Sequence, residues 1–219
     1  MRKAHLDLPI DEAQARALRV GDILYLTGRM FTARDRAHQT MLSALERGTR
    51  PPFDPSQMAL YHCGPIVQRI NDDWEAVAAG PTTSARMEMF EDRFLEAFAP
   101  RLIVGKGGMG DRTQKALGRI GAAYAQYTGG AGALAAQRIE RVDEVHWLDE
   151  LGMADAVWIF AVRAFGPLVV TMDSEGGNLS KQLEPMIAEN LRAIRAWIEG
   201  RRTVPPSVRD KGEDATHGG

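Results

Sequence analysis

Residues 80–87 read Gly-Pro-Thr-Thr-Ser-Ala-Arg-Met and combine a turn, three hydroxyl groups and one guanidinium. Gly80-Pro81 is a turn signal, and any of the three hydroxyl residues that follow can cap a helix. A helix that starts at Thr82 carries Arg86 one turn later on the same face. Hydroxyl, backbone N–H groups and guanidinium then converge, as a bound carboxylate or phosphate requires. The alternative is an ordinary capped helix with a solvated arginine.

The flanking residues predict a strand before this segment and a helix after it. Residues 75–79 form the strand, and the helix places an apolar stripe on one face and acidic residues on the other. The stripe consists of Met87, Phe90, Phe94 and Phe98, and the outward acids are Glu88, Glu91 and Asp92. This segment therefore connects two core elements.

The rest of the chain alternates between strand and helix patterns, which predicts a mixed α/β (α+β) domain. Further strands are predicted at 5–10, 23–27, 58–63, 101–104, 122–127, 141–148, 156–165 and 167–173. Further helices are predicted at 11–18, from 37 to 45, at 111–119 and at 183–198. We divide the chain into one domain at 1–180, a helical extension at 181–200 and a disordered tail at 201–219.

Composition excludes several classes of protein. The net charge is −2, with 27 basic and 29 acidic residues mixed along the chain, so a basic field for nucleic acid is absent. No apolar run approaches the roughly 20 residues of a membrane span, and the first residues lack the pattern of a secretory signal. We expect a cytoplasmic protein that binds neither nucleic acid nor a membrane.

Cys63 is the only cysteine. The chain can form no internal disulfide and cannot hold an iron–sulfur cluster or a thiolate zinc site by itself. No activating base lies near Cys63 in sequence, which favours a small buried core residue over a nucleophile. We interpret the neighbouring His62 as structural too.

Residues 105–110 read Gly-Lys-Gly-Gly-Met-Gly, between a predicted strand and a predicted helix. The spacing matches the dinucleotide fingerprint G-x-G-x-x-G. However, that fingerprint needs an acidic residue about 20 positions later, and the next strand ends in Thr128-Gly129-Gly130 without one. We therefore interpret Lys106 as a cation that faces a ligand, and nicotinamide binding stays open as a weaker alternative.

The helix near residue 37 begins with an unusual pair of cations. Arg34 and Arg36 lie in its first turn, where the helix dipole favours acidic residues, and Asp35 and His38 accompany them. This conflict with a local rule suggests a functional demand, although two solvated arginines would look the same.

Four segments together resemble the beta subunit, or C-terminal domain, of class I fumarate hydratases and L(+)-tartrate dehydratases. They are residues 28–38, 61–65, 80–87 and 105–107, in that order. The resemblance runs from about residue 5 to 179, and it implies a three-layer β/β/α swivelling domain. It also implies that an alpha subunit holds a [4Fe–4S] cluster, in a heterodimer or an α2β2 assembly.

The resemblance also assigns roles. It implies that Arg34, Arg86 and Lys106 bind a C4 dicarboxylate and that Thr82 transfers a proton. Fumarate/malate is the first expectation for the substrate and L-tartrate the second. We expect Asp35, His38 and Thr83 to hold these groups in place, and no metal ligand on this chain. The competing hypothesis is a non-catalytic module that binds an anion for regulation.

Overall fold

The computed structural model describes residues 2–201 and divides the chain into two units, Met1–Asn178 and Leu179–Gly219. The strands are β1 (Lys3–Asp7), β2 (Ile23–Thr32), β3 (Ala59–Tyr61), β4 (Ile66–Ile70), β5 (Asp73–Ala78), β6 (Leu102–Gly105), β7 (Ala123–Gln126), β8 (Ile139–His146) and β9 (Val157–Met172). The helices of the first unit are α1 (Glu12–Arg16), α2 (Asp35–Glu46), α3 (Glu88–Phe98), α4 (Asp111–Ile120), α5 (Gly132–Ala136) and α6 (Leu148–Leu151).

Seven strands form one sheet in the order β1-β2-β3-β6-β7-β9-β8. The run β3-β6-β7 is parallel, and β2 pairs with β3 in parallel and with β9 in antiparallel fashion. Because β9 also pairs with β7, the pairings of β2, β3, β6, β7 and β9 close into a ring. Strands β4 and β5 form a separate hairpin.

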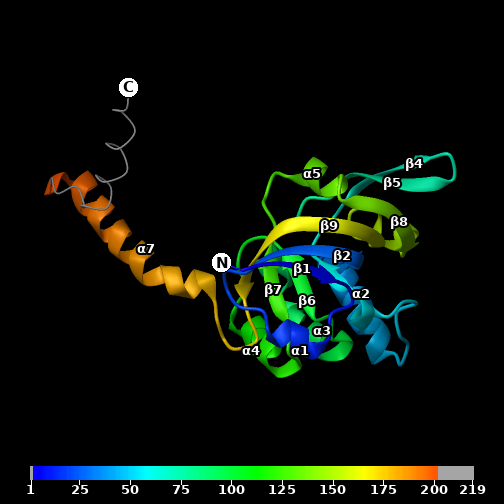
Figure 1. Cartoon of the computed structure of the whole chain (residues 1–219), viewed down its shortest axis with the longest axis horizontal. Coiled ribbons are helices and arrows are strands. Elements are labelled where there is room, and N and C mark those ends of the chain that lie inside the picture. The colour runs from blue at the N-terminus through cyan, green and yellow to red at the C-terminus, as the bar shows by residue number, and fades with distance from the viewer. Residues whose placement is uncertain (1, 202–219) are drawn as a thin grey trace. The chain divides into compact units, whose positions relative to one another are not determined.

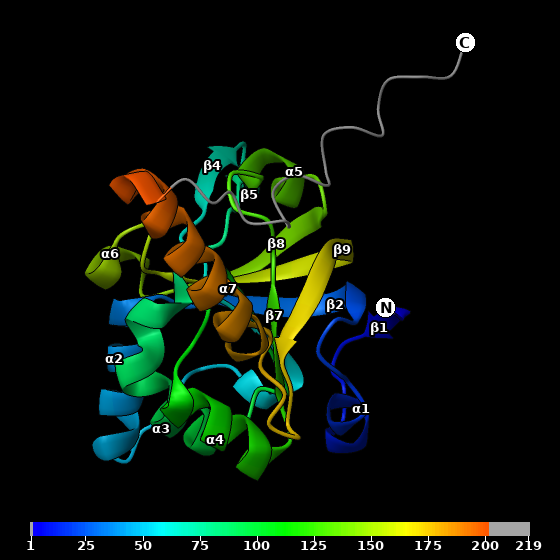
Figure 2. The same ribbon diagram turned by 90° about the vertical axis from the view of Figure 1, so that its left-hand side faces the viewer.

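The alternation of side chains on β3 and β6 separates two hydrophobic cores. Tyr61 and Val104 point into a core shared with β2 and β9, whereas Leu60 and Ile103 point into a core shared with α2, α3 and α4. Figure 1 shows β1, β2 and β9 on the far side of β6 and β7 from these helices, and Figure 2 shows α3 beside α4. Two strand layers and one helix layer result, and the predicted mixed α/β class is confirmed.

Two glycines that predict strand ends lie inside strands instead. Gly28 was expected to end its strand, but β2 continues to Thr32; a Cβ at Gly28 would lie 2.8 Å from the Leu8 carbonyl oxygen. Likewise β9 is one strand of 16 residues that passes through Gly166, where a Cβ would lie 2.5 Å from the Leu24 carbonyl oxygen. Each glycine lets another backbone segment approach its strand closely. From sequence alone, a glycine of this kind cannot be distinguished from one in a turn.

Other elements follow local rules. Asp11 and Gln14 form a reciprocal capping box at the start of α1, as the acidic residue there predicts. The β4 strand was not predicted. The turn between β4 and β5 contains Asn71, which has a positive φ of 56°. Within residues 2–201 every helix is too short or too polar for a bilayer span.

In the second unit, α7 (Leu179–Ala196) is followed by a π-helical turn at Trp197–Arg201. The apolar side chains Ile187, Leu191 and Ile194 of α7 and Ile198 of the turn are exposed. The tail that we predicted to be disordered lies, from residue 202 onward, outside the described residues.

Candidate anion-binding site

Backbone bonds join residues 81–84 to the ends of two neighbouring parallel strands. Thr82 N–H donates to the His62 carbonyl after β3, at 2.7 Å, and Ser84 N–H donates to the Lys106 carbonyl after β6, at 3.0 Å. Thr83 and Lys106 also form an isolated parallel bridge. Three of the four sequence segments therefore meet at the carboxyl-terminal edge of the sheet, where loops of α/β proteins commonly bind ligands.

Of the three candidate caps, the interpretation that places the helix start at Thr82 is wrong. Residues Ser84–Met87 form a 3-10 turn, and α3 begins only at Glu88. Thr83 occupies the cap position without a side-chain hydrogen bond, and Thr82 lies before the turn, so Thr82 and Arg86 do not share a helix face. Thr82 lies outside the helical turn because its backbone N–H bonds to the His62 carbonyl, and the Ser84 N–H bonds to the Lys106 carbonyl.

The fourth segment reaches this edge through an ion pair. Arg86 Nη2 lies 2.5 Å from Oδ2 of Asp35, the first residue of α2. Burial raises the pKa of Asp35, but its own backbone N–H and the Arg86 guanidinium outweigh burial and hold the pKa below its ordinary value. The Arg86 side chain is 49% exposed, so its remaining donors face solvent.

Arg34 lies one residue earlier, at the N-cap of α2, and is more enclosed. Its Nε is 3.5 Å from Asp155 Oδ1, at ion-pair distance without an aligned hydrogen bond. Gly64 packs against it, because a Cβ there would lie 2.7 Å from Arg34 Nη1. The neighbouring His38 ring donates from Nδ1 to the Arg34 carbonyl at 2.8 Å, which fixes the backbone of the arginine. No sequence motif identified Asp155 as a partner of Arg34.

The other site residues lie in loops. Lys106 is half-buried beside Gly129, and no ion pair joins it to a carboxylate in residues 2–201. Thr82 is half-buried and Thr83 is exposed. The structure thus brings the segments of Arg34, Arg86 and Lys106 together.

The N-terminus of α4, where a dinucleotide phosphate would bind, already holds a carboxylate. Glu88 accepts hydrogen bonds from the backbone N–H groups of Gly110 (2.7 Å), Arg112 (3.2 Å) and Thr113 (3.3 Å), and from the Thr113 hydroxyl (2.6 Å). These are the donors that would otherwise bind an anion. The glycine run after β6 therefore resembles the dinucleotide fingerprint without an open phosphate site.

Buried titratable groups lie beneath the loops. Cys63 is 1% exposed, and burial raises the pKa of its thiol, which confirms a core residue rather than a nucleophile. His38, His62 and Glu91 are fully buried with their donor atoms within 4.8 Å of one another, the one group of described residues suited to a metal ion. The prediction that Glu91 faces solvent is wrong, because histidines of α2 and of the segment after β3 provide buried partners for it.

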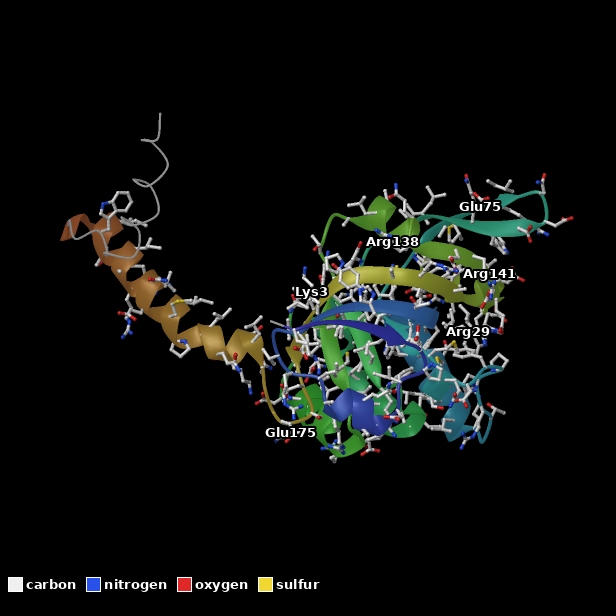
Figure 3. All side chains as sticks on the ribbon, in the orientation of Figure 1. Lys3, Arg29, Glu75, Arg138, Arg141 and Glu175 are labelled. Atoms are coloured by element: carbon white, nitrogen blue, oxygen red, sulfur yellow. The ribbon has the colours of Figure 1, made fainter. Side chains whose placement is uncertain are left out.

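A cavity of about 420 Å³ lies elsewhere and is lined by residues of β5 and β8, among them Glu75 and Arg141, which Figure 3 labels. Of the three cations, only Arg86 has a largely exposed side chain, whereas Arg34 and Lys106 are partly buried.

The fold is an α+β domain in which the segments of Arg34, Arg86 and Lys106 meet at one sheet edge. A family model described as the Fumarase C-terminus matches residues 1–183, and the chain belongs to this family. The chain is 42% identical over 185 residues to "Putative L(+)-tartrate dehydratase subunit beta" of Methanocaldococcus jannaschii, covering 84% of this chain and 95% of that protein. It is 42% identical over 188 residues to "L(+)-tartrate dehydratase subunit beta" of Escherichia coli, covering 85% and 91%.

A longer relative is "Putative fumarate hydratase class I" of Geobacillus stearothermophilus, 39% identical over 191 residues. The match covers 87% of this chain but 36% of that protein. The same domain thus occurs both as a separate subunit and as part of a longer chain.

Proposed function

We propose that this chain is the beta subunit of a hydro-lyase that adds water to, or removes water from, a C4 dicarboxylate. The observation that carries the proposal is the meeting of the Arg34, Arg86 and Lys106 segments at one sheet edge, joined by the Thr83–Lys106 bridge and the Arg86–Asp35 ion pair. The names of the relatives support the reaction class, with L(+)-tartrate and fumarate/malate as the candidate substrates.

The three cations would bind the carboxylates of the substrate. A guanidinium can bind a carboxylate through two parallel hydrogen bonds, which fixes orientation as well as position. Removal of a proton next to a carboxylate places extra negative charge on that group, and fixed cations stabilise this charge in the transition state. Thr82 is our candidate for proton transfer, and its hydroxyl needs an activating base from outside this chain because a free hydroxyl is a weak base.

The cofactor that the family resemblance implies, a [4Fe–4S] cluster, does not fit this chain, whose single thiol is buried in the core. We propose that an alpha subunit holds it. When bound there, the cluster would supply a Lewis-acidic iron for the departing hydroxyl. The residues of this chain would contribute the binding and orientation of the substrate.

Anaerobic co-production with a cluster-binding partner tests this proposal. The purified complex should convert at least one acid of a panel of fumarate, malate and L(+)-tartrate, whereas each subunit alone should not. A stable complex with an intact cluster that turns over none of these acids would contradict the enzyme, and binding without turnover would favour the regulatory module.

A further inference from the structure

Three fully buried polar side chains meet beneath the anion-binding loops. Glu91 of α3 places Oε2 3.2 Å from Nε2 of His38 and 3.2 Å from Nε2 of His62. The contacts are at ion-pair distance and not aligned as hydrogen bonds. Each of the three side chains is 0% exposed, so their charges interact in a low dielectric.

The far side of each histidine contacts an anion-binding segment. His38 Nδ1 lies 2.8 Å from the Arg34 carbonyl, and a carbonyl only accepts, so this nitrogen carries a proton. His62 Nδ1 lies 2.9 Å from the Ser84 hydroxyl, in the segment that leads to Arg86. One buried carboxylate is thereby linked to two of the three segments.

The network continues to the third segment. Ser84 Oγ lies 2.9 Å from the Tyr124 hydroxyl, which donates to the Gly107 carbonyl at 2.8 Å, next to Lys106. Gly105 has no room for a side chain here, because a Cβ would lie 1.9 Å from Ser84 Oγ and 3.2 Å from His62 Nδ1. The polar chain therefore runs from Arg34 to Gly107 through the protein interior.

The donors of this polar chain point in one direction. The Gly107 carbonyl accepts the single proton of Tyr124, so the Ser84 hydroxyl donates to Tyr124 and His62 Nδ1 donates to Ser84. Burial disfavours an ionised Glu91, but the two histidines outweigh burial and keep the carboxyl ionised.

We propose that Glu91, His38 and His62 are positioning residues: the buried carboxylate lies between the two histidines and sets the relative positions of Arg34, Ser84–Arg86 and Lys106. The consequence for catalysis rests on the proposed function. The network acts through backbone and hydroxyl contacts, and none of the three side chains is exposed to touch substrate.

The first test uses the chain alone. Nitrogen-15 NMR of the histidine rings should show Nδ1 protonated in both His38 and His62, as the contacts with the Arg34 carbonyl and the Ser84 hydroxyl require. An unprotonated Nδ1 on either ring in the wild-type chain would overturn the network, and so would one stoichiometric divalent metal ion per chain in elemental analysis, since a metal would then hold the three side chains.

The second test uses the complex with its partner. Glu91→Gln should lower kcat/KM at least 100-fold, and Glu91→Asp, which keeps the charge, should recover at least tenfold of that loss. Glu96→Gln, on the exposed side of the same helix, is the control and should stay within twofold of wild type. An active wild-type complex in which Glu91→Gln equals Glu96→Gln would overturn the positioning role, whereas an inactive wild-type complex would contradict only the proposed function.

Discussion

Arg86 and Asp35 are 51 residues apart in sequence, and their side chains form an ion pair of 2.5 Å across the start of α2. The pair joins the segment after β5 to the segment after β2. The Asp35 carboxylate thus binds one nitrogen of the guanidinium that we assign to the substrate.

We predict that Asp35→Asn lowers kcat/KM of the complex about tenfold, because Arg86 loses the contact that orients it. Stability should change by less than about 1 kcal/mol, since both side chains are partly exposed. Urea unfolding and steady-state kinetics measure the two effects. A rise in kcat/KM would show instead that the carboxylate competes with the substrate for Arg86.

The carboxylate at the start of α4 should matter for stability. Glu88→Ala removes the acceptor of four donors, three of them backbone N–H groups, and should cost about 1–3 kcal/mol of unfolding free energy. Glu96→Ala is the matched control, because Glu96 lies on α3 like Glu88 and its removal breaks only an exposed ion pair with Arg119. Equal losses in the two variants would refute this role.

Wild-type protein titrated with a nicotinamide dinucleotide should show no binding.

Acid should remove the contribution of Glu91 to stability. Its two histidine partners outweigh burial and lower its pKa from 4.5 to about 2, so the stabilisation is present above pH 4.5 and is lost as the pH falls toward 2. This lowering of the pKa corresponds to on the order of 3 kcal/mol of unfolding free energy. The other titratable groups that face it are His38, His62 and Tyr124.

The measurement is the difference in unfolding free energy between wild type and Glu91→Gln across that range. We expect this difference to shrink steadily from pH 5 to pH 2. A difference that is independent of pH would mean that the carboxyl is not ionised in the folded protein.

The sequence predicted most strands, the core stripe of α3 and the family, because local periodicity and motif order are sufficient for these. It failed at Gly28 and Gly166, where the reason for glycine is the backbone of Leu8 or Leu24 from another part of the chain. Local rules could not reveal such close approaches.

The site shows the same division. The motifs identified the segments of Arg34, Arg86 and Lys106, but Glu91 read as an outward helix residue between apolar neighbours. Its partners come from two other elements, so only the fold reveals it. Among the three candidate caps, the sequence did not rule out Thr82 for a related reason, because its backbone N–H bonds to the His62 carbonyl after β3.

The central claim is that this chain supplies the dicarboxylate-binding cations to an active site completed by a partner. The most direct measurement is the kcat/KM of the Arg86→Ala complex, with Arg93→Ala, an exposed arginine of α3 paired with Glu46, as control. We predict a fall of roughly 10²–10³-fold for Arg86→Ala, as for loss of one fixed donor to transition-state charge, and a change below twofold for the control. A correctly folded Arg86→Ala complex with nearly wild-type kcat/KM would contradict the claim.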